Sequence, residues 1–367
     1  MAILIPRKLS VFIKLTKQCN LHCSYCFERS ERFNIRRINL SEAKEIMHKV
    51  RDYCVRNRIA RLNLNFSGGE ILMLGKRYLT FLFKYCRAAF AKDRIALTIN
   101  VQTNLTLLDI EFIEIFKKYN IEVGTSFDVY GENRRFANGK STKKIMIDKI
   151  LLMLRNGLPL AGSIVVVNGR NYDKALKTYE FYSKTLINFH PMMVFPWTND
   201  PSHTLQITIQ QYINYLKIIA TKHVSREGAE IILANIDSYI GLLKKGAGNY
   251  HWCAFEKNCF ENRFFILNNG DVFPCYYLQN GEFYLGNILK KSLNSIVRTK
   301  KISRLRKRHN SIVKKCKGCR YLGLCNGGCM ALAYYESGSL SEPSQFDCRV
   351  NRSMFKYIKG LLKKQDL

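Results

Sequence analysis

The sequence lacks the features that mark disordered, exported or membrane-spanning chains. It has only 7 prolines among 367 residues, 47% of its residues are hydrophobic, and it contains no tandem repeat or low-complexity tract, a composition typical of a globular protein. Lys8 and Lys14 interrupt the apolar N-terminal stretch, no small-residue cleavage site follows it, and no apolar run is long enough to span a bilayer. We therefore expect a cytoplasmic protein that makes no membrane contact.

Acidic residues are also scarce. The chain has 28 Asp and Glu against 59 Lys and Arg, which gives a formal net charge of +31. Between Lys290 and Lys317 there are twelve basic residues and no acidic one. Such a run is typical of a solvated helix face, or of a surface that contacts an acidic peptide or a nucleic acid. Charge alone does not choose between these alternatives.

Cysteine, in contrast, is abundant. Disulfides do not persist in a reducing cytosol, so the 13 cysteines are expected to be thiols, and most of them metal ligands. Cys54 and Cys86 fall in predicted helices and are expected to be small core residues. The others form an N-terminal trio and a C-terminal octet: Cys19, Cys23 and Cys26, then Cys253, Cys259, Cys275, Cys316, Cys319, Cys325, Cys329 and Cys348.

Hydrophobic patterning predicts short strands that alternate with amphipathic helices. The predicted strands span residues 9–15, 61–66, 95–101, 121–127, 161–167 and 187–195, and named helices span 41–55, 106–119 and 142–157. This alternation implies a parallel sheet with right-handed crossovers, so we predict an α/β fold, a partial (β/α)6 TIM-like barrel. Its reactive face should lie at the carboxyl ends of the strands. We assign the barrel and its bridging helices to residues 1–245 and a small cysteine-rich domain to residues 246–367.

The N-terminal trio, in the stretch CNLHCSYC, has the spacing of a metal loop. Three thiolates can hold one [4Fe–4S] cube and leave its fourth iron open. An open coordination position is what a catalytic metal centre needs to bind a substrate or cofactor. A zinc loop completed by a distant residue is the alternative that the spacing leaves open.

CNLHCSYC, at the end of the first strand of a parallel α/β pattern, resembles the cluster loop of the radical S-adenosylmethionine (SAM) enzymes. In that family the amine and carboxylate of SAM chelate the open iron. One electron then cleaves SAM to methionine and a 5′-deoxyadenosyl radical, which abstracts a substrate hydrogen. The missing fourth ligand would therefore be the cofactor itself.

Further stretches resemble the same family in the expected order: SGGE after the second strand, QTN after the third and TSFDVYGENRR at the fourth. The resemblance implies that Glu70 holds the SAM amino group and that Arg134 or Arg135 contacts its carboxylate. The implied SAM-binding residues are Gly68, Gly69, Glu70, Gln102, Asn104, Ser126 and Arg134.

The C-terminal octet includes CKGCRYLGLCNGGC, and zinc or a disulfide framework would be the plain explanation of its spacing. However, the arrangement closely resembles the SPASM domain, the auxiliary-cluster module of radical SAM enzymes that act on peptides and proteins, as does YLGNILKKSLNSI at 284–296. The resemblance implies two auxiliary [4Fe–4S] clusters and three clusters in all. Their ligands would be Cys253, Cys259, Cys275 and Cys329 for one cluster, and Cys316, Cys319, Cys325 and Cys348 for the other. Because these thiolates would fill both clusters, we infer that the clusters pass electrons and do not bind substrate.

The ligand spacing, including Cys253, is most similar to that of the anaerobic sulfatase maturases, which oxidise a cysteine or serine to formylglycine. In those enzymes an aspartate follows the cysteine that corresponds to Cys275 and serves as base. This chain has Tyr276 there, and the unperturbed tyrosine pKa of about 10 makes it a poor base at neutral pH. Tyr276 and Asp271 are the candidates for a catalytic acid or base.

We therefore predict a radical SAM oxidoreductase that modifies a side chain or backbone carbon of a ribosomally made peptide or protein, with sulfatase maturation as the alternative. An RNA-modifying enzyme is less favoured, because no RNA-binding module is evident, and an electron carrier would need no open iron. The cysteine loop starts at residue 19, so we expect an acidic leader peptide to be held by a separate protein or by the basic run. The expected electron donor is of the flavodoxin or ferredoxin type.

Overall fold

The computed structural model describes residues 8–194, 205–225, 230–248 and 252–365. Its centre is a sheet in which the first six strands are parallel and hydrogen-bonded in chain order. These strands are β1 (Lys8–Thr16), β2 (Arg61–Gly68), β3 (Ala96–Gln102), β4 (Ile121–Ser126), β5 (Leu160–Val167) and β6 (Phe189–Met193). The six predicted strands are confirmed, although Phe195, the last residue of the sixth prediction, lies outside the described residues.

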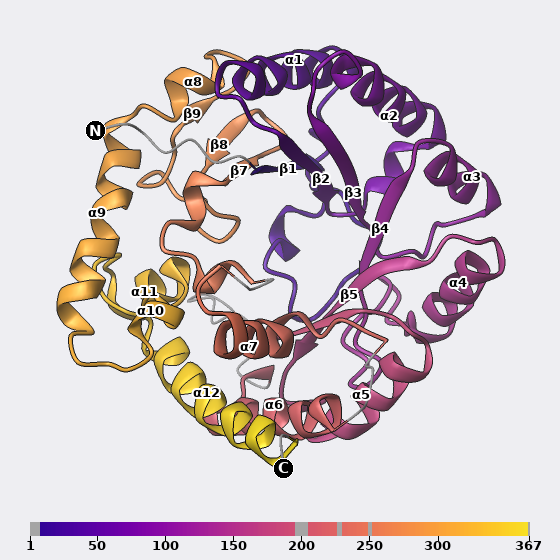
Figure 1. Ribbon diagram of the computed structural model, residues 1–367. Helices are drawn as coiled ribbons and strands as arrows, with labels where there is room; N and C mark the ends of the chain where they lie inside the picture. Colours follow the sequence, from indigo (N-terminus) through magenta and orange to yellow (C-terminus); the bar gives the residue numbers. More distant parts are fainter. Residues whose placement is uncertain (1–7, 195–204, 226–229, 249–251, 366–367) are drawn as a thin grey trace.

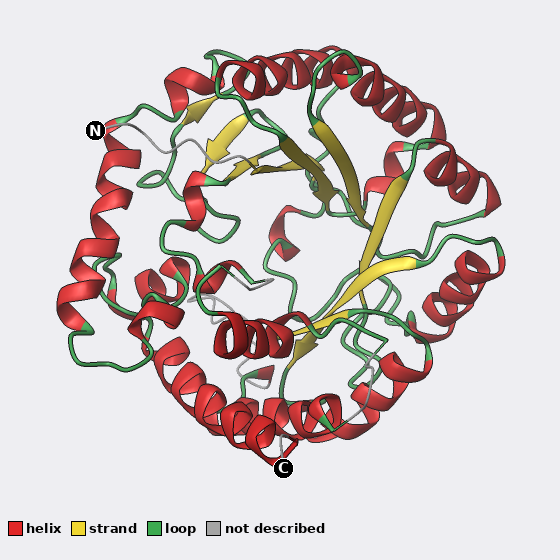
Figure 2. Cartoon of the chain, viewed as in Figure 1, coloured by secondary structure: helices red, strands yellow, loops and turns green. Residues whose placement is uncertain are grey.

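Helices surround the curved sheet, as Figures 1 and 2 show. Those that follow the six strands are α1 (Leu40–Arg56), α2 (Lys76–Phe90), α3 (Ile110–Lys118), α4 (Lys143–Arg155), α5 (Ala175–Lys184) and α6 (Ile209–Val224). This alternation confirms the predicted α/β fold of a partial barrel. It also brings the loops that follow the strands to one end of the barrel, where parallel barrels place their sites.

Local sequence explains where these elements lie. In β1, Leu9, Val11 and Ile13 are fully buried, and the alternate residues face the barrel interior. The helix predicted over 106–119 is shorter in the structure, since α3 begins only at Ile110. The Asp109 side chain caps α3 by accepting a hydrogen bond from the N–H of Phe112, and such a cap marks a helix start.

The C-terminal part continues the same sheet. Its strand β7 (Arg263–Ile266) pairs in parallel with β1, and β8 (Asp271–Phe273) and β9 (Gly286–Asn287) follow it in antiparallel fashion, which makes a nine-stranded sheet. The remaining helices are α7 (Ala234–Lys245), α8 (Leu293–Ile296), α9 (Lys300–Lys315), α10 (Leu322–Cys325), α11 (Met330–Ser337) and α12 (Gln345–Gln365). Backbone hydrogen bonds therefore tie the two parts of the chain together.

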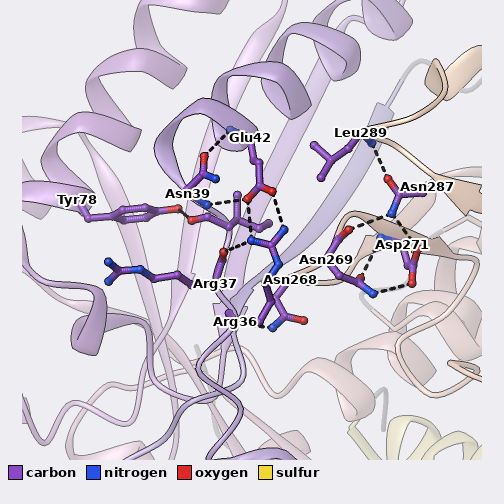
Figure 3. A network of polar contacts seen from close by, with 11 residues as sticks. Arg36, Arg37, Asn39, Glu42, Tyr78, Asn268, Asn269, Asp271, Asn287 and Leu289 are labelled. Atoms are coloured by element: carbon purple, nitrogen blue, oxygen red, sulfur yellow. Dashed lines mark hydrogen bonds and ion pairs between the residues drawn. The ribbon is translucent and has the colours of Figure 1, made fainter.

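Side chains reinforce this connection, as Figure 3 shows. The amide of Asn268 donates to the carbonyl oxygen of Arg36 over 2.7 Å, and the Arg36 guanidinium binds the Glu42 carboxylate at 2.6 and 3.0 Å. Glu42 also forms a capping box with Asn39 at the start of α1. The hairpin that begins at β7 is thus anchored to the segment that leads from the cysteine loop into α1.

The final helix, α12, runs beside α6 and α7 (Figure 1). The hydroxyl of Tyr239 in α7 donates to the side chain of Asn351 over 2.6 Å, and the hydroxyls of Thr221 in α6 and Tyr357 lie 2.7 Å apart. The chain end therefore packs on the helices that follow β6. Within the described ranges, none of the helices combines the length and the apolar character that a bilayer crossing requires.

Candidate functional site

The cysteine loop, residues 17–28, follows β1 and lies at the carboxyl ends of the parallel strands. Its cysteines line a cavity together with the glycines of the turn at the end of β2 and a tyrosine from the C-terminal part. The lining residues include Cys19, Cys23, Cys26, Glu28, Gly68, Gly69 and Tyr276. Residues that are far apart in the sequence thus share one site.

The three thiols of the loop are hard to ionise without a metal. Burial raises the pKa of Cys19 to about 12 and that of Cys26 to about 11, and it also raises the pKa of Cys23. A bound metal stabilises thiolates and so lowers such pKa values. A set of three neighbouring thiols that depends on added positive charge fits a metal cluster.

Main-chain hydrogen bonds hold the loop in shape. The N–H of Leu21 donates to the Cys19 sulfur over 3.4 Å, which is one of the contacts that tune a thiolate ligand. On the other side, the N–H of His22 donates to the carbonyl of Arg135 over 2.7 Å, and that of Ser24 donates to the carbonyl of Asn133 over 3.0 Å. The segment after β4 therefore clamps the cysteine loop.

The same segment carries Arg134 and Arg135, the two candidates for binding the SAM carboxylate, and their side chains have different partners. Arg134 donates from Nη1 to the Tyr25 hydroxyl over 3.1 Å, and its buried Nε has no hydrogen-bond partner among the described residues. The Arg135 guanidinium instead binds the Glu132 carboxylate and the carbonyl of Gly139, each at 2.9 Å. Of the two side chains, Arg134 is the one with a donor left for a carboxylate beside the loop.

The glycine turn touches the cysteine loop directly. A Cβ on Gly68 would lie 2.3 Å from the carbonyl oxygen of Thr16, and one on Gly69 would lie 2.1 Å from that of Gln18. These glycines are needed because two backbones meet there, and the N–H of Gly69 donates to Thr16 over 2.9 Å. The glycine turn thus fixes the position of the cysteine loop relative to the sheet.

Glu70 is fully buried and has its hydrogen bonds within the protein. Its Oε1 accepts from the Leu72 N–H at 2.9 Å and the Thr103 hydroxyl at 2.7 Å, and its Oε2 accepts from the Asn104 N–H at 2.6 Å. Burial raises its pKa, while these donors lower it. The carboxylate therefore connects the turn after β2 to the turn after β3.

The residues predicted at the ends of β3 and β4 also come together. The Asn104 amide donates to the side chain of Asn20 at 2.9 Å and lies 3.9 Å from the Cys19 sulfur. Gln102 donates to the Ser126 hydroxyl over 3.0 Å, across the pair β3 and β4. These side chains lie at the carboxyl ends of β3 and β4, and Asn104 is the one of them that contacts the cysteine loop.

Asp128 is a neighbour of this site that sequence reasoning missed. It is buried, and its Oδ1 accepts the N–H of Val166 over 2.8 Å. Burial raises its pKa to about 6, and the charge of Arg134 opposes that rise. The signal was available in TSFDV, where an acidic residue directly follows a predicted strand at the reactive end of the sheet.

The C-terminal cysteines fall into two neighbourhoods. Burial raises the pKa of Cys259, and the thiols of Cys253 and Cys275 raise it further. The same two thiols add to the effect of burial on Cys329. Because such effects weaken with distance, these four thiols are neighbours: Cys253 and Cys259 precede β7, Cys275 follows β8, and Cys329 precedes α11.

The other four thiols lie together where α9, α10 and α12 meet. Burial raises the pKa of Cys316, and Cys319 and Cys348 raise it further; Cys348 also contributes to the raised pKa of Cys325, which is about 11. Within the described ranges, no three His, Cys, Asp or Glu side chains converge on the position of a single metal ion. The thiols are instead grouped in fours, a donor set that suits a [4Fe–4S] cluster.

Arg308 lies between these two neighbourhoods, although it belongs to the basic run. It is 5% exposed, and its Nη2 approaches the carbonyls of Gly327 and Gly328 at 3.3 Å. Burial lowers its pKa, and thiols of both groups, Cys329 and Cys325 among them, raise it. The helical spacing of the sequence indicates that Arg308 is buried, because it shares the buried face of α9 with Ile302, Leu305 and Ile312.

Of the two candidates for an acid or base, only Tyr276 lines the cavity. Its ring lies 5.1 Å from that of Phe27, and burial raises its pKa well above the usual value. Asp271 belongs to the hairpin network of Figure 3, where its carboxylate accepts from Asn269 at 2.7 Å and from Asn287 at 2.9 Å.

Comparison with protein families matches both parts of the chain. Residues 13–182 match the radical SAM superfamily, and residues 258–320 match the SPASM family, an iron–sulfur cluster-binding domain. Among curated relatives, the cysteine-type anaerobic sulfatase-maturating enzyme of Clostridium novyi is 25% identical over 88% of this chain and 88% of its own length. The serine-type anaerobic sulfatase-maturating enzyme of Bacteroides thetaiotaomicron is 26% identical over 85% of this chain and 80% of its own.

Solved structures share the fold. Native anSMEcpe with bound AdoMet and the Cp18Cys peptide matches with a TM-score of 0.83 at 19% identity, covering 98% of this chain and 99% of that one. Streptococcus suis SuiB matches with a TM-score of 0.66 at 17% identity, covering 91% of this chain and 76% of the other. Both therefore share the overall fold of this chain.

Proposed function

Because this chain is a radical SAM protein with a C-terminal SPASM domain, we propose that it oxidises a cysteine or serine side chain of a protein to formylglycine. One observation of the structure carries this proposal: the cysteine trio, the glycine turn and Tyr276 line the same cavity. A substrate side chain in that cavity would be within reach of both the cysteine loop and the SPASM part.

The residues present fit the groups that this chemistry needs. Cys19, Cys23 and Cys26 would hold the cluster that binds SAM, which supplies a 5′-deoxyadenosyl radical after one-electron cleavage. The C-terminal thiols would hold the two auxiliary clusters in the two groups of four given above. Since each group offers four thiols, neither auxiliary cluster needs a substrate ligand.

We divide the SAM-binding residues by role. Arg134, with a free donor beside the loop, would bind the SAM carboxylate. Glu70 would act indirectly, because its carboxylate already accepts three protein hydrogen bonds and positions Asn104. Gly68 and Gly69 would offer main-chain atoms, and Gln102 and Ser126 would bind SAM from the strand ends.

The sequence alone favoured a general peptide maturase, with sulfatase maturation as the alternative. The curated relatives support the alternative better, because the enzymes of Clostridium novyi and Bacteroides thetaiotaomicron are sulfatase-maturating enzymes that align along most of their length. Tyr276 is the observation that keeps peptide maturation as a second candidate, since the maturases have an aspartate at this position.

The partners follow from charge and redox chemistry. We propose a flavodoxin or ferredoxin type electron donor and a peptide or protein substrate of acidic character, given the net charge of +31. All 13 cysteines are free thiols, which suits a cytoplasmic enzyme. We also propose that the two functional parts divide near Gly246, where α7 ends.

The test is anaerobic turnover by the reconstituted holoenzyme. The enzyme, SAM and dithionite are incubated with the Cp18Cys and Kp18Cys peptides named for the solved complexes, and mass spectrometry follows the target residue. We expect a thiol to be replaced by an aldehyde. Cys19→Ala should abolish the product, whereas Cys54→Ala, at a buried core cysteine of α1, should retain it.

The second candidate has a different outcome. Short peptides encoded beside the gene are assayed in parallel, and a peptide that becomes lighter by two hydrogens without an aldehyde would identify a peptide maturase. If the sulfatase-type peptides remain unchanged while such a peptide reacts, the proposed function is wrong.

A further inference from the structure

The cavity of the cysteine loop contains a carboxylate that the sequence resemblance does not assign, that of Glu28. Glu28 follows Cys26 by two residues, and its side chain is 10% exposed. It lines the cavity together with Cys26, Gly69 and Tyr276. The site therefore has an acidic side chain even though Tyr276 occupies the position of the maturase aspartate.

Lys14 holds this carboxylate in place. It is the penultimate inward-facing residue of β1, it is 2% exposed, and its Nζ pairs with Oε1 of Glu28. The ammonium also lies 4.8 Å from the ring centre of Tyr276 and 5.6 Å from that of Phe27. A buried charge is stable only with such partners, so Lys14 fixes the rotamer of Glu28 and neutralises its charge.

The wall beside Glu28 is aromatic, while Lys17, His22 and Arg32 line other parts of the cavity. Phe27 and Tyr276 meet edge to face at 5.1 Å, and Phe265 of β7 lies 5.8 Å from Tyr276. Hydrogen bonds to the oxygens of a mostly buried carboxylate are strong, because the acceptor is charged and the low local dielectric screens the interaction little. Oε1 is bound to Lys14, and no described residue donates a hydrogen bond to Oε2.

We propose that Glu28 is the substrate-positioning carboxylate of this enzyme, with Oε2 accepting a hydrogen bond from the hydroxyl or thiol of the target side chain. Glu28, in the cysteine loop, thereby supplies the carboxylate that the maturases have at the position of Tyr276. The inference rests on the proposed function and deepens it, since it defines the target as a neutral side chain with an O–H or S–H group. A cationic target is disfavoured because the charge of Glu28 is already neutralised by Lys14.

The test measures how tightly SAM cleavage is coupled to aldehyde formation in the reconstituted holoenzyme. The Cp18Cys peptide and its serine counterpart are turned over anaerobically, and two products are measured, peptide aldehyde and 5′-deoxyadenosine. In Glu28→Gln we expect the ratio of aldehyde to 5′-deoxyadenosine to fall about 10- to 100-fold, the usual effect of removing a charged hydrogen-bond acceptor. Glu114→Gln is the matched control, since Glu114 lies on α3, outside the cavity lining, and forms an exposed pair with Lys117.

A rescue variant separates positioning from folding. Tyr276→Asp, added to Glu28→Gln, returns a carboxylate to the cavity and should restore much of the ratio. The inference is overturned if Glu28→Gln leaves the ratio unchanged, or if both products fall together, which would mean that Glu28 only supports the loop. If the unmodified enzyme forms 5′-deoxyadenosine but no aldehyde from either peptide, the proposed function itself is wrong and the inference is lost with it.

Discussion

Replacing Glu70 by Gln distinguishes the two roles that this residue could have. The side-chain amide can keep one oxygen for Leu72 and Thr103, but its nitrogen then faces the N–H of Asn104, which loses a 2.6 Å hydrogen bond. A lost hydrogen bond to a charged group, with a buried donor left unpaired, costs about 3 kcal/mol. In a chain of this size that lowers the Tm by roughly 5 °C.

The assay is thermal unfolding of the anaerobic protein, measured with and without SAM. Glu45→Gln provides the control, because Glu45 forms only a surface pair with Lys49 on α1, and such pairs contribute little. We expect Glu70→Gln to lower the Tm equally in the absence and presence of SAM. An unchanged Tm without SAM, combined with a loss of SAM binding, would refute the positioning role and indicate direct contact with the SAM amine.

Three further predictions follow from buried charges. Lys14→Met leaves Glu28 as an unpaired buried carboxylate and should lower the free energy of unfolding by about 3–5 kcal/mol. The loss should be smaller in the double variant that also carries Glu28→Gln. Equal losses for the single and the double variant, measured by chemical denaturation, would contradict this. The pKa of Asp128 is raised from 3.8 to about 6, so binding of its proton favours the folded state. The resulting contribution to the free energy of unfolding, about 3 kcal/mol, is fully present below pH 4 and is lost as pH rises through 6. Asp128→Asn should therefore flatten the pH dependence of apo-protein stability between pH 4 and 6, and an unchanged slope would show that another group causes it. Arg308→Met removes a positive charge between the auxiliary sites and should shift their reduction potentials to more negative values in EPR-monitored titrations; the exposed Lys307→Met should not, and equal shifts would assign the effect to net charge.

The fold was largely predictable because its signals are local. Six strands and the helices between them follow from alternation and helical periodicity, and sequential parallel pairing follows from the crossover rule. The pairing of β7 with β1 was not predictable, because β7 has only four residues and its partner lies some 250 positions earlier in the chain. Periodicity gives no information about such distant partners.

The neighbourhood of the cysteines was predictable, while their role as cluster ligands stays a prediction; the electrostatics of the site was less predictable. Cysteine spacing identified the thiols, since spacing itself defines a metal loop. Lys14, within an apolar strand, was taken only as an interruption of an apolar run, and its pairing with Glu28 depends on how the loop folds back over the barrel. Arg308 was hidden in the basic run, because composition does not show which face of a helix is buried.

The most direct test of the central claim follows the hydrogen atom that the reaction removes. The holoenzyme is turned over with a Cp18Cys peptide that is deuterated at the β-carbon of its target cysteine, and 5′-deoxyadenosine is analysed by mass spectrometry. We expect deuterium to move into 5′-deoxyadenosine, together with aldehyde formation, and both to be lost in Cys19→Ala. Unlabelled 5′-deoxyadenosine alongside a fully deuterated peptide would contradict the claim that this enzyme oxidises the β-carbon of a protein side chain.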